Sequence, residues 1–292
     1  MKNQLKKMLI LFFAMCLFTP QVAHANMAAP AEADIGSSIT FEKNDEIAVL
    51  SEVLDITVNG SQADIVATYR MKNTTDKSIS TPSMFLSPNM ESSDVKVVVN
   101  GKATKFTAEK YELTYDTQAK SNDWQYAVLI NKVVASLVDT ITFTMDFSPD
   151  EEYDVIVSYS YRLGGYPDYD FNVKKGVIDY YIAPAAMWKN FSNLKINLYL
   201  DEAMPIIKSS NLAFHKIDTR TYQYTSDTLP QENLRIVIDE NWWQNIFSTI
   251  RSPYLPMMLL MFSPVILIVA PIVIFLAWRV HKKKKQMNQN FR

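Results

Sequence analysis

The sequence is poor in the residues that most catalytic and metal-binding motifs need. Its 292 residues include one cysteine, three histidines and six glycines. Because Cys16 is the single cysteine, no disulfide can form within the chain, and the fold must rely on its core. So few glycines leave no loop to cradle a phosphate. His215 is the one histidine between residues 26 and 250, and no G-x-S-x-G motif accompanies it. These counts argue against zinc and Ser-His-Asp catalysis, so we predict neither enzymatic activity nor a cofactor.

Acidic residues are absent from both ends of the chain. All 31 lie between residues 26 and 250. Of the 29 lysines and arginines, three precede residue 26 and seven follow residue 250, so 19 remain in the central stretch. That stretch therefore carries a net charge of about −12, although the whole chain carries −2. A surface of this sign argues against nucleic acid as a partner.

The first 25 residues read as a secretory signal peptide. Lysines precede a short apolar run over residues 8–18, and Ala23-His24-Ala25 fits the small-x-small cleavage rule. The alternative is a lipoprotein signal with Cys16 as the modified residue, but bulky Phe13 and Met15 stand where that signal needs small residues. We expect cleavage after residue 25 and a linker over residues 26–38.

Near the other end, residues 255–278 form a 24-residue stretch without a formal charge. Its length predicts a single transmembrane helix, with membrane lipid as a partner. A basic tail follows over residues 279–292, which predicts a cytoplasmic C-terminus and an N-terminal ectodomain outside the cell membrane. The predicted membrane-interface residues are Trp242, Trp243, Trp278, Arg279, Lys282, Lys283, Lys284 and Lys285.

The predicted ectodomain shows the period-two alternation of strands with one apolar face. In TITFTMDF, Ile141, Phe143, Met145 and Phe147 share one face, opposite threonines and Asp146. Similar runs cover residues 62–72, 153–162, 194–200 and 233–239. Helical spacing is limited to short segments near Thr107–Tyr115 and Pro184–Phe191. The pattern predicts an all-β fold built of β-sandwiches.

Turn residues divide this fold. Asn59-Gly60 and Asn100-Gly101 lie between alternating runs and predict hairpins. Leu163 to Gly176 holds three of the six glycines, which suggests a boundary between a larger sandwich over residues 39–163 and a smaller one over residues 164–240. One continuous sandwich with a long loop is the alternative.

Three segments resemble a family of bacterial exported, membrane-anchored ectodomains catalogued as domains of unknown function. They are ADIVATYRMKNTTDKSISTPSMF, FSPDEEYDVIVSYSY and YYIAPAAMWKNFSNLKINLYL. The first module also loosely resembles the VIT-type sandwich of inter-alpha-trypsin-inhibitor proteins. The resemblance covers roughly residues 39–239. It implies a β-sandwich fold and provides no catalytic residues.

Two acidic segments are candidates for binding. In YPDYDF aromatic and acidic residues alternate, so this loop could stack on a sugar or peptide; its candidate residues are Tyr166, Asp168, Tyr169, Asp170 and Phe171. The alternative is a hinge loop whose aromatics pack between the modules. Asp150, Glu151, Glu152 and Asp154 lie on a predicted turn, where we expect a solvated surface, with weak calcium binding as the alternative.

The C-terminal segment offers two further candidates. NWWQNIF places its apolar residues at helical spacing, which predicts an interfacial helix over residues 241–254. Prolines within the predicted transmembrane span suggest a helix-packing surface made by Ser263, Pro264 and Pro271, against a plain anchor as the alternative.

These observations favour a non-enzymatic, membrane-anchored binding or scaffolding protein at the cell surface. It could be a subunit of a membrane assembly, with another integral membrane protein, a surface protein or cell-wall glycan as partner. The alternative is a glycan-directed hydrolase or carbohydrate-binding module that uses the 166–171 loop.

Overall fold

The computed structural model describes residues 29–30, 38–113, 126–130, 136–169, 172–230 and 232–263, together with 271, 275, 278 and 279. The chain divides into two units. We call residues 1–166 and 174–239 the sheet unit, and residues 167–173 and 240–292 the C-terminal unit. The predicted signal peptide and most of the 26–38 linker lie outside the described residues.

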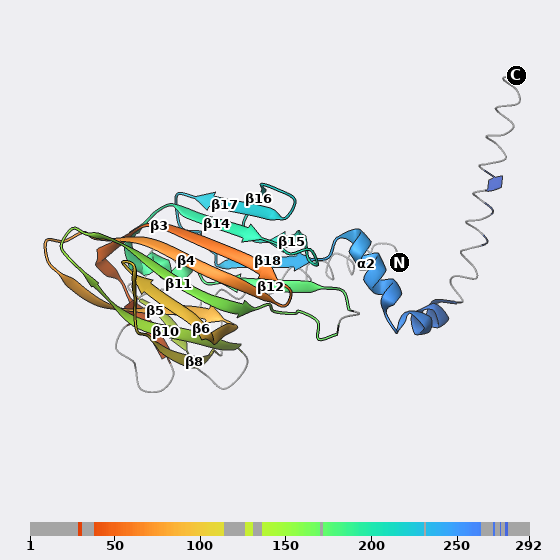
Figure 1. Cartoon of the computed structure of the whole chain (residues 1–292), viewed down its shortest axis with the longest axis horizontal. Coiled ribbons are helices and arrows are strands. Elements are labelled where there is room, and N and C mark those ends of the chain that lie inside the picture. Colours follow the sequence, from red (N-terminus) through yellow and green to blue (C-terminus); the bar gives the residue numbers. More distant parts are fainter. Residues whose placement is uncertain are drawn as a thin grey trace, which may run out of the picture. The chain divides into compact units, whose positions relative to one another are not determined.

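The largest sheet in the described part of the chain has nine strands and joins both halves of the sequence (Figure 1). Its order is β16-β17-β14-β3-β4-β11-β6-β7, and β13 pairs with β3. The pairs that β13 and β14 make with β3 are parallel, and the other pairs are antiparallel. The strands are β3 (Asn44–Asn59), β4 (Gln62–Asn73), β6 (Met90–Val99), β7 (Lys102–Ala103), β11 (Glu152–Arg162), β13 (Trp188–Phe191), β14 (Leu194–Tyr199), β16 (His215–Lys216) and β17 (Thr221–Ser226).

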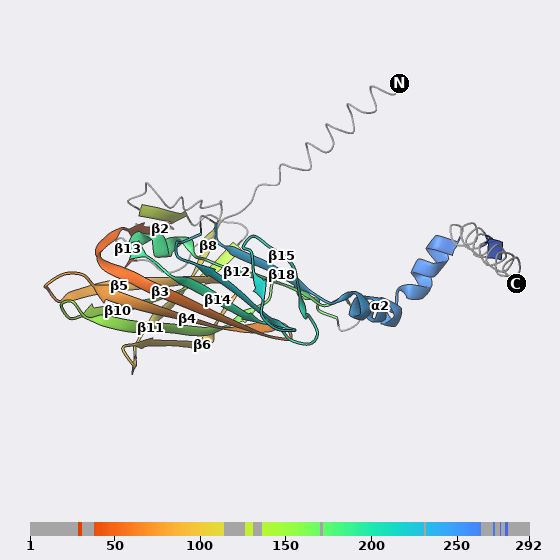
Figure 2. The same ribbon diagram turned by 90° about the horizontal axis from the view of Figure 1, so that it is seen from above.

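Three smaller sheets complete the described β-structure, and Figure 2 gives a second view of the arrangement. One has the order β5-β10-β8, the next β12-β18-β15, and the last β1-β2-β9. Their strands are β1 (Ala29–Pro30), β2 (Ser38–Glu42), β5 (Ile79–Pro88), β8 (Thr107–Leu113), β9 (Tyr126–Ile130), β10 (Ser136–Phe147), β12 (Lys175–Tyr180), β15 (Ile206–Ser210) and β18 (Leu234–Asp239). The prediction of a mostly β fold is confirmed, but Thr107–Leu113 is a strand rather than a helix. A short 3-10 helix, Ala183–Met187, precedes β13.

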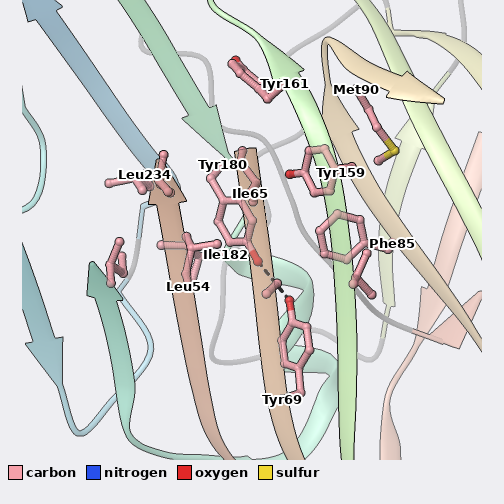
Figure 3. Packing of buried hydrophobic residues seen from close by; sticks show 14 of the residues in the cluster. Leu54, Ile65, Tyr69, Phe85, Met90, Tyr159, Tyr161, Tyr180, Ile182 and Leu234 are labelled. Carbon is pink, nitrogen blue, oxygen red and sulfur yellow. Dashed lines mark hydrogen bonds between the residues drawn. The ribbon is translucent and has the colours of Figure 1, made fainter. Parts of the chain in front are cut away.

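One hydrophobic cluster contains inward side chains from the large sheet and from two of the smaller sheets. Phe85 of β5 packs edge-on against Tyr159 of β11, with ring centroids 5.5 Å apart, and lies 6.3 Å from Tyr180 of β12 (Figure 3). Strands on both sides of the 163–176 stretch thus share one sheet and one core. This arrangement favours the alternative of one continuous sandwich over two separate ones.

The turns follow the sequence chemistry. Both predicted hairpins are confirmed: Asn100-Gly101 connects β6 to β7, whereas β3 ends at Asn59 and Gly60-Ser61 connects it to β4. Asn100 and Gly101 have φ angles of 49° and 73°, the left-handed pair that two-residue hairpin turns require. Pro149-Asp150 also joins two strands, but these strands belong to different sheets, so this turn carries the chain from one layer to the other.

A β-bulge at Leu50 changes which residues of β3 face the core. Ile47 and Val49 are buried before it, while Glu52, Leu54 and Ile56 are buried after it, so the inward positions change from odd to even. The register against β4 shifts between Val49 and Ser51, which leaves Leu50 as the extra residue. The Leu50 carbonyl accepts hydrogen bonds from Ser192 Oγ at 2.8 Å and Asn193 Nδ2 at 3.1 Å. The turn before β14 therefore holds the bulge in place.

The prediction of a transmembrane helix over residues 255–278 is wrong for the structure as described. None of the helices in the described residues is both long enough and apolar enough to cross a membrane. The continuous described helix in this stretch covers residues 255–263, which at 1.5 Å per residue is about 14 Å and well short of a ~30 Å hydrocarbon core. Residues 264–270, 272–274 and 276–277 lie outside the described residues.

The shared core predicts that the sheet unit unfolds as one cooperative block. Phe85→Ala should lower its stability by about 3–5 kcal/mol, because a fully buried ring is lost where two small sheets meet the large one. Tyr199→Ala, at a side chain that is 40% exposed, should cost much less. Chemical denaturation read by hydrogen exchange checks this. Two separate transitions, with residues 176–239 unaffected by Phe85→Ala, would contradict a shared core.

Candidate functional site

The helix α2 (Trp242–Arg251) in the C-terminal unit begins at a complete capping box. Asn241 Oδ1 accepts a hydrogen bond from the Gln244 backbone N–H at 3.0 Å, and Gln244 Oε1 accepts one from the Asn241 N–H at 2.9 Å. Two backbone donors that a helix start leaves unpaired are thereby satisfied. The helix ends at Arg251, and Pro253 follows soon after. Its boundaries are therefore fixed by its own sequence.

A carboxylate supports the start of α2 as well. Ser248 Oγ lies 2.9 Å from both Glu240 oxygens and donates to that carboxylate. This contact ties the second turn of the helix to the residue just before its N-cap. The negative charge at the N-terminus and Arg251 in the last turn both favour the helix dipole.

The side chains of α2 are divided between an apolar and a polar side. We define the apolar face of α2 as Trp242, Trp243, Ile246, Phe247 and Ile250, which helical spacing places within one arc. Four of these are well exposed: Trp242 (67%), Trp243 (63%), Phe247 (58%) and Ile250 (57%). No residue of α2 is buried. An amphipathic helix normally hides such a face, so one left in contact with water indicates an interaction surface.

The exposed apolar surface continues in the residues that follow. Six consecutive side chains of the 255–263 helix are exposed: Met257, Met258, Leu259, Leu260, Met261 and Phe262. No acidic residue follows Glu240 in the sequence, whereas seven lysines and arginines do. Apolar and basic character are therefore combined in this part of the chain.

The structure describes the predicted 166–171 loop in part. Tyr166 is half-buried, packs against the core of the sheet unit and lies under Lys174 Nζ, 5.6 Å from its ring centroid. Asp168 and Tyr169 belong to the C-terminal unit and are exposed, Tyr169 by 61%. Asp170 and Phe171 lie outside the described residues. The five candidates are thus divided between a core-packing residue and a solvent-exposed pair, with two not described.

The remaining predicted residues of the C-terminal segment are also only partly described. Trp278 is 57% exposed and its ring centroid lies 6.2 Å from that of Phe275. Ser263 Oγ donates to the Leu260 carbonyl at 2.7 Å, a bond within its own helix. Arg279 and Pro271 are helical and exposed. Pro264 and Lys282, Lys283, Lys284 and Lys285 lie outside the described residues.

The acidic turn at residues 150–154 is occupied by contacts within the fold. Arg70 binds Glu152 at 3.1 Å and Asp154 at 3.0 Å, and Tyr153 donates to Glu151 at 2.6 Å. The bond from Tyr153 lowers the pKa of the Glu151 carboxyl. Within the described residues, no group of three or more His, Cys, Asp or Glu side chains could hold a metal ion. His215 is exposed on β16.

Sequence reasoning missed a buried carboxyl in the core. Glu52 of β3 is fully buried and lies beside Tyr69, its register partner on β4. Tyr180 Oη donates to Glu52 Oε1 at 2.8 Å, and the Tyr69 and Tyr180 hydroxyls are 3.0 Å apart (Figure 3). Burial raises the pKa of Glu52 from 4.5 to about 7, and hydrogen bonds from Tyr180 and Tyr69 oppose this only in part. The sequence does carry a signal for this burial: the apolar residues of β3 stand at odd positions at Ile47 and Val49 but at even positions at Leu54 and Ile56. Reading the alternation within only one of these runs does not show that Glu52 faces the core.

Comparison with known proteins adds little to these observations. No family model matches the chain, and no curated protein matches it either. A solved structure of a protein proposed to bind nutrients, from Legionella pneumophila, is similar at 14% identity and a TM-score of 0.48, over 79% of this chain and 77% of that one. A two-domain M1 zinc metallopeptidase mutant bound to L-tryptophan is similar at 10% identity and a TM-score of 0.32, over 68% of this chain and 44% of that one. Likenesses this weak carry no argument about function, and the resemblance to exported ectodomains stays a prediction.

The capping box predicts how α2 responds to substitution. Asn241→Ala should weaken the first turn by about 1 kcal/mol, because the Gln244 N–H loses its acceptor. Asn245→Ala, at an exposed position within the same helix, should leave the helix as stable or slightly more so, since alanine favours helices. Amide exchange of residues 243–246 measures both. Equal protection in the two variants would show that the cap does not define this helix.

Proposed function

We propose that the chain is a non-enzymatic binding or scaffolding protein whose α2 helix lies on a lipid bilayer through its apolar face. The observation that carries this proposal is the exposure of four large apolar side chains on a helix that buries none. The capping box and the Glu240–Ser248 contact favour this helix through hydrogen bonds within its own segment, and these bonds do not require a partner. The sheet unit is then the part that the helix holds at the membrane.

The chemistry of this face favours lipid over a folded protein partner. Trp242 and Trp243 are amphipathic rings, which prefer the boundary between headgroups and acyl chains. Phe247 and Ile250 supply purely apolar area on the same side, and the polar side carries amides and hydroxyls that can remain in water. A helix in this position lies along the interface with one side in each environment.

Charge supports the same partner. The segment after Glu240 has seven basic residues and no acidic one, while residues 26–250 are strongly acidic. An anionic bilayer would attract the basic segment by about 1 kcal/mol per lysine or arginine close to its surface and would repel the acidic stretch. This separation of charge orients the molecule without any specific ligand.

The proposal is tested by the environment of single labelled positions in the full chain. In a Cys16→Ser background, Phe247→Cys on the apolar face and Asn245→Cys on the polar side each receive an environment-sensitive fluorophore. The chain is reconstituted into vesicles of phosphatidylcholine and phosphatidylglycerol. The label at position 247 should be quenched by shallow lipid nitroxides and be about tenfold less accessible to an aqueous quencher than the label at position 245.

Either of two results would overturn this assignment. Equal access of the aqueous quencher to both positions would mean that α2 is not at the lipid interface. Protection of position 247 that appears on addition of a soluble protein, but not on addition of lipid, would mean that the face binds protein instead. Vesicles of phosphatidylcholine alone serve as the control for charge, and they should reduce the difference between the two positions.

A further inference from the structure

The Glu52 cluster lies where two layers of the sandwich meet. Glu52 and Tyr69 come from β3 and β4 of the large sheet, whereas Tyr180 ends β12 of the β12-β18-β15 sheet. The hydrogen bond from Tyr180 to Glu52 therefore joins the two layers, and so does the contact between the Tyr180 and Tyr69 hydroxyls, which Figure 3 shows. Leu54, two residues further along β3, and Ile182, two residues after Tyr180, both belong to the buried hydrophobic cluster.

A carboxyl at this buried position is unfavourable for the stability of the fold. A side chain at an inward position of a sheet stabilises the fold most when it is apolar, and burying an ionised carboxylate is unfavourable even when it is hydrogen-bonded. The bulge at Leu50 turns Glu52 into the core together with Leu54 and Ile56, so a leucine or isoleucine would suit the same phase.

We propose that Glu52, Tyr69 and Tyr180 form a proton-sensitive latch that holds the β12-β18-β15 sheet against the large sheet. The neutral carboxyl closes the latch. Loss of its proton leaves a buried charge that the tyrosine hydroxyls stabilise only in part, and the cost of this burial loosens the smaller sheet. This device goes beyond lipid attachment by α2 and does not depend on it.

The direction of the pH response follows from the groups that face the carboxyl. Burial raises the pKa of Glu52 to about 7 from 4.5, so the folded chain holds a proton that the unfolded chain releases. The stability from this group is complete below about pH 4.5 and is lost as the pH rises to about 7. Its neighbours are Tyr69 of β4, Tyr180 of β12 and Tyr159 of β11, and burial raises the pKa of each above 10, so they stay neutral throughout.

Hydrogen exchange on the full chain tests the latch directly. Protection of residues 175–180 and 234–239, corrected for intrinsic exchange rates, should fall on the order of 100-fold between pH 5 and pH 8. This size follows because the pKa of Glu52 is about 7 in the folded chain and 4.5 in the unfolded chain. Glu52→Gln should remove most of this fall, because the amide cannot ionise. Glu46→Gln, at an exposed glutamate of the same strand, should retain it in full.

Tyr180→Phe provides the second variant and keeps the test decisive if Glu52→Gln does not fold. It removes a hydroxyl that stabilises the ionised carboxyl, so the midpoint of the fall should move to higher pH. Carbon-13 NMR of labelled glutamate in the native chain should show one carboxyl that titrates near pH 7. Native protection that is constant with pH, a fall that persists unchanged in Glu52→Gln, or a midpoint that moves to lower pH in Tyr180→Phe would each refute the latch.

Discussion

The parallel pairing of β14 with β3 is the contact on which the rest of the sheet unit depends. It places residues 194–199 beside residues 52–57, and β17 and β16 then extend the same sheet. The turn before β14 also supplies the Ser192 and Asn193 side chains that bind the Leu50 carbonyl. One contact between distant parts of the chain thus extends the sheet, holds the bulge and sets the phase of β3. The inward position of Glu52 is a consequence of that phase.

The two units present different solutions to the same physical problem. In the sheet unit the apolar faces cover one another, and the fully buried Glu52 carboxyl accepts a hydrogen bond from the Tyr180 hydroxyl. In the C-terminal unit α2 is stabilised by hydrogen bonds at its start, while its apolar face stays in contact with water. The first arrangement makes the core sensitive to protonation, and the second leaves a surface that lipid can cover. Both proposals start from a group in an unfavourable environment: a carboxyl in the core, and an apolar helix face in water.

Much of the fold could be predicted from the sequence because its signals are local. Alternation in TITFTMDF, the Asn-Gly turns and the helical spacing of NWWQNIF depend on neighbouring residues, and each corresponds to an element of the structure. The bulge at Leu50 could not be predicted in this way, since its hydrogen-bond donors are Ser192 and Asn193, about 140 residues away. Glu52 was missed for the same reason. The transmembrane prediction is wrong for the described residues, because their continuous helix over 255–263 is too short to cross a membrane.

The measurement that tests the account most directly is disulfide trapping across β3 and β14. In a Cys16→Ser background, Asp55→Cys with Asn197→Cys joins positions that are register partners and whose side chains hydrogen-bond at 2.7 Å. Lys195→Cys with Thr57→Cys offers two cysteines on the same strands that are not in register. The account predicts rapid oxidation of the first pair and little of the second. Comparable oxidation of both pairs, or none of either, would contradict the parallel pairing and with it the inward placement of Glu52.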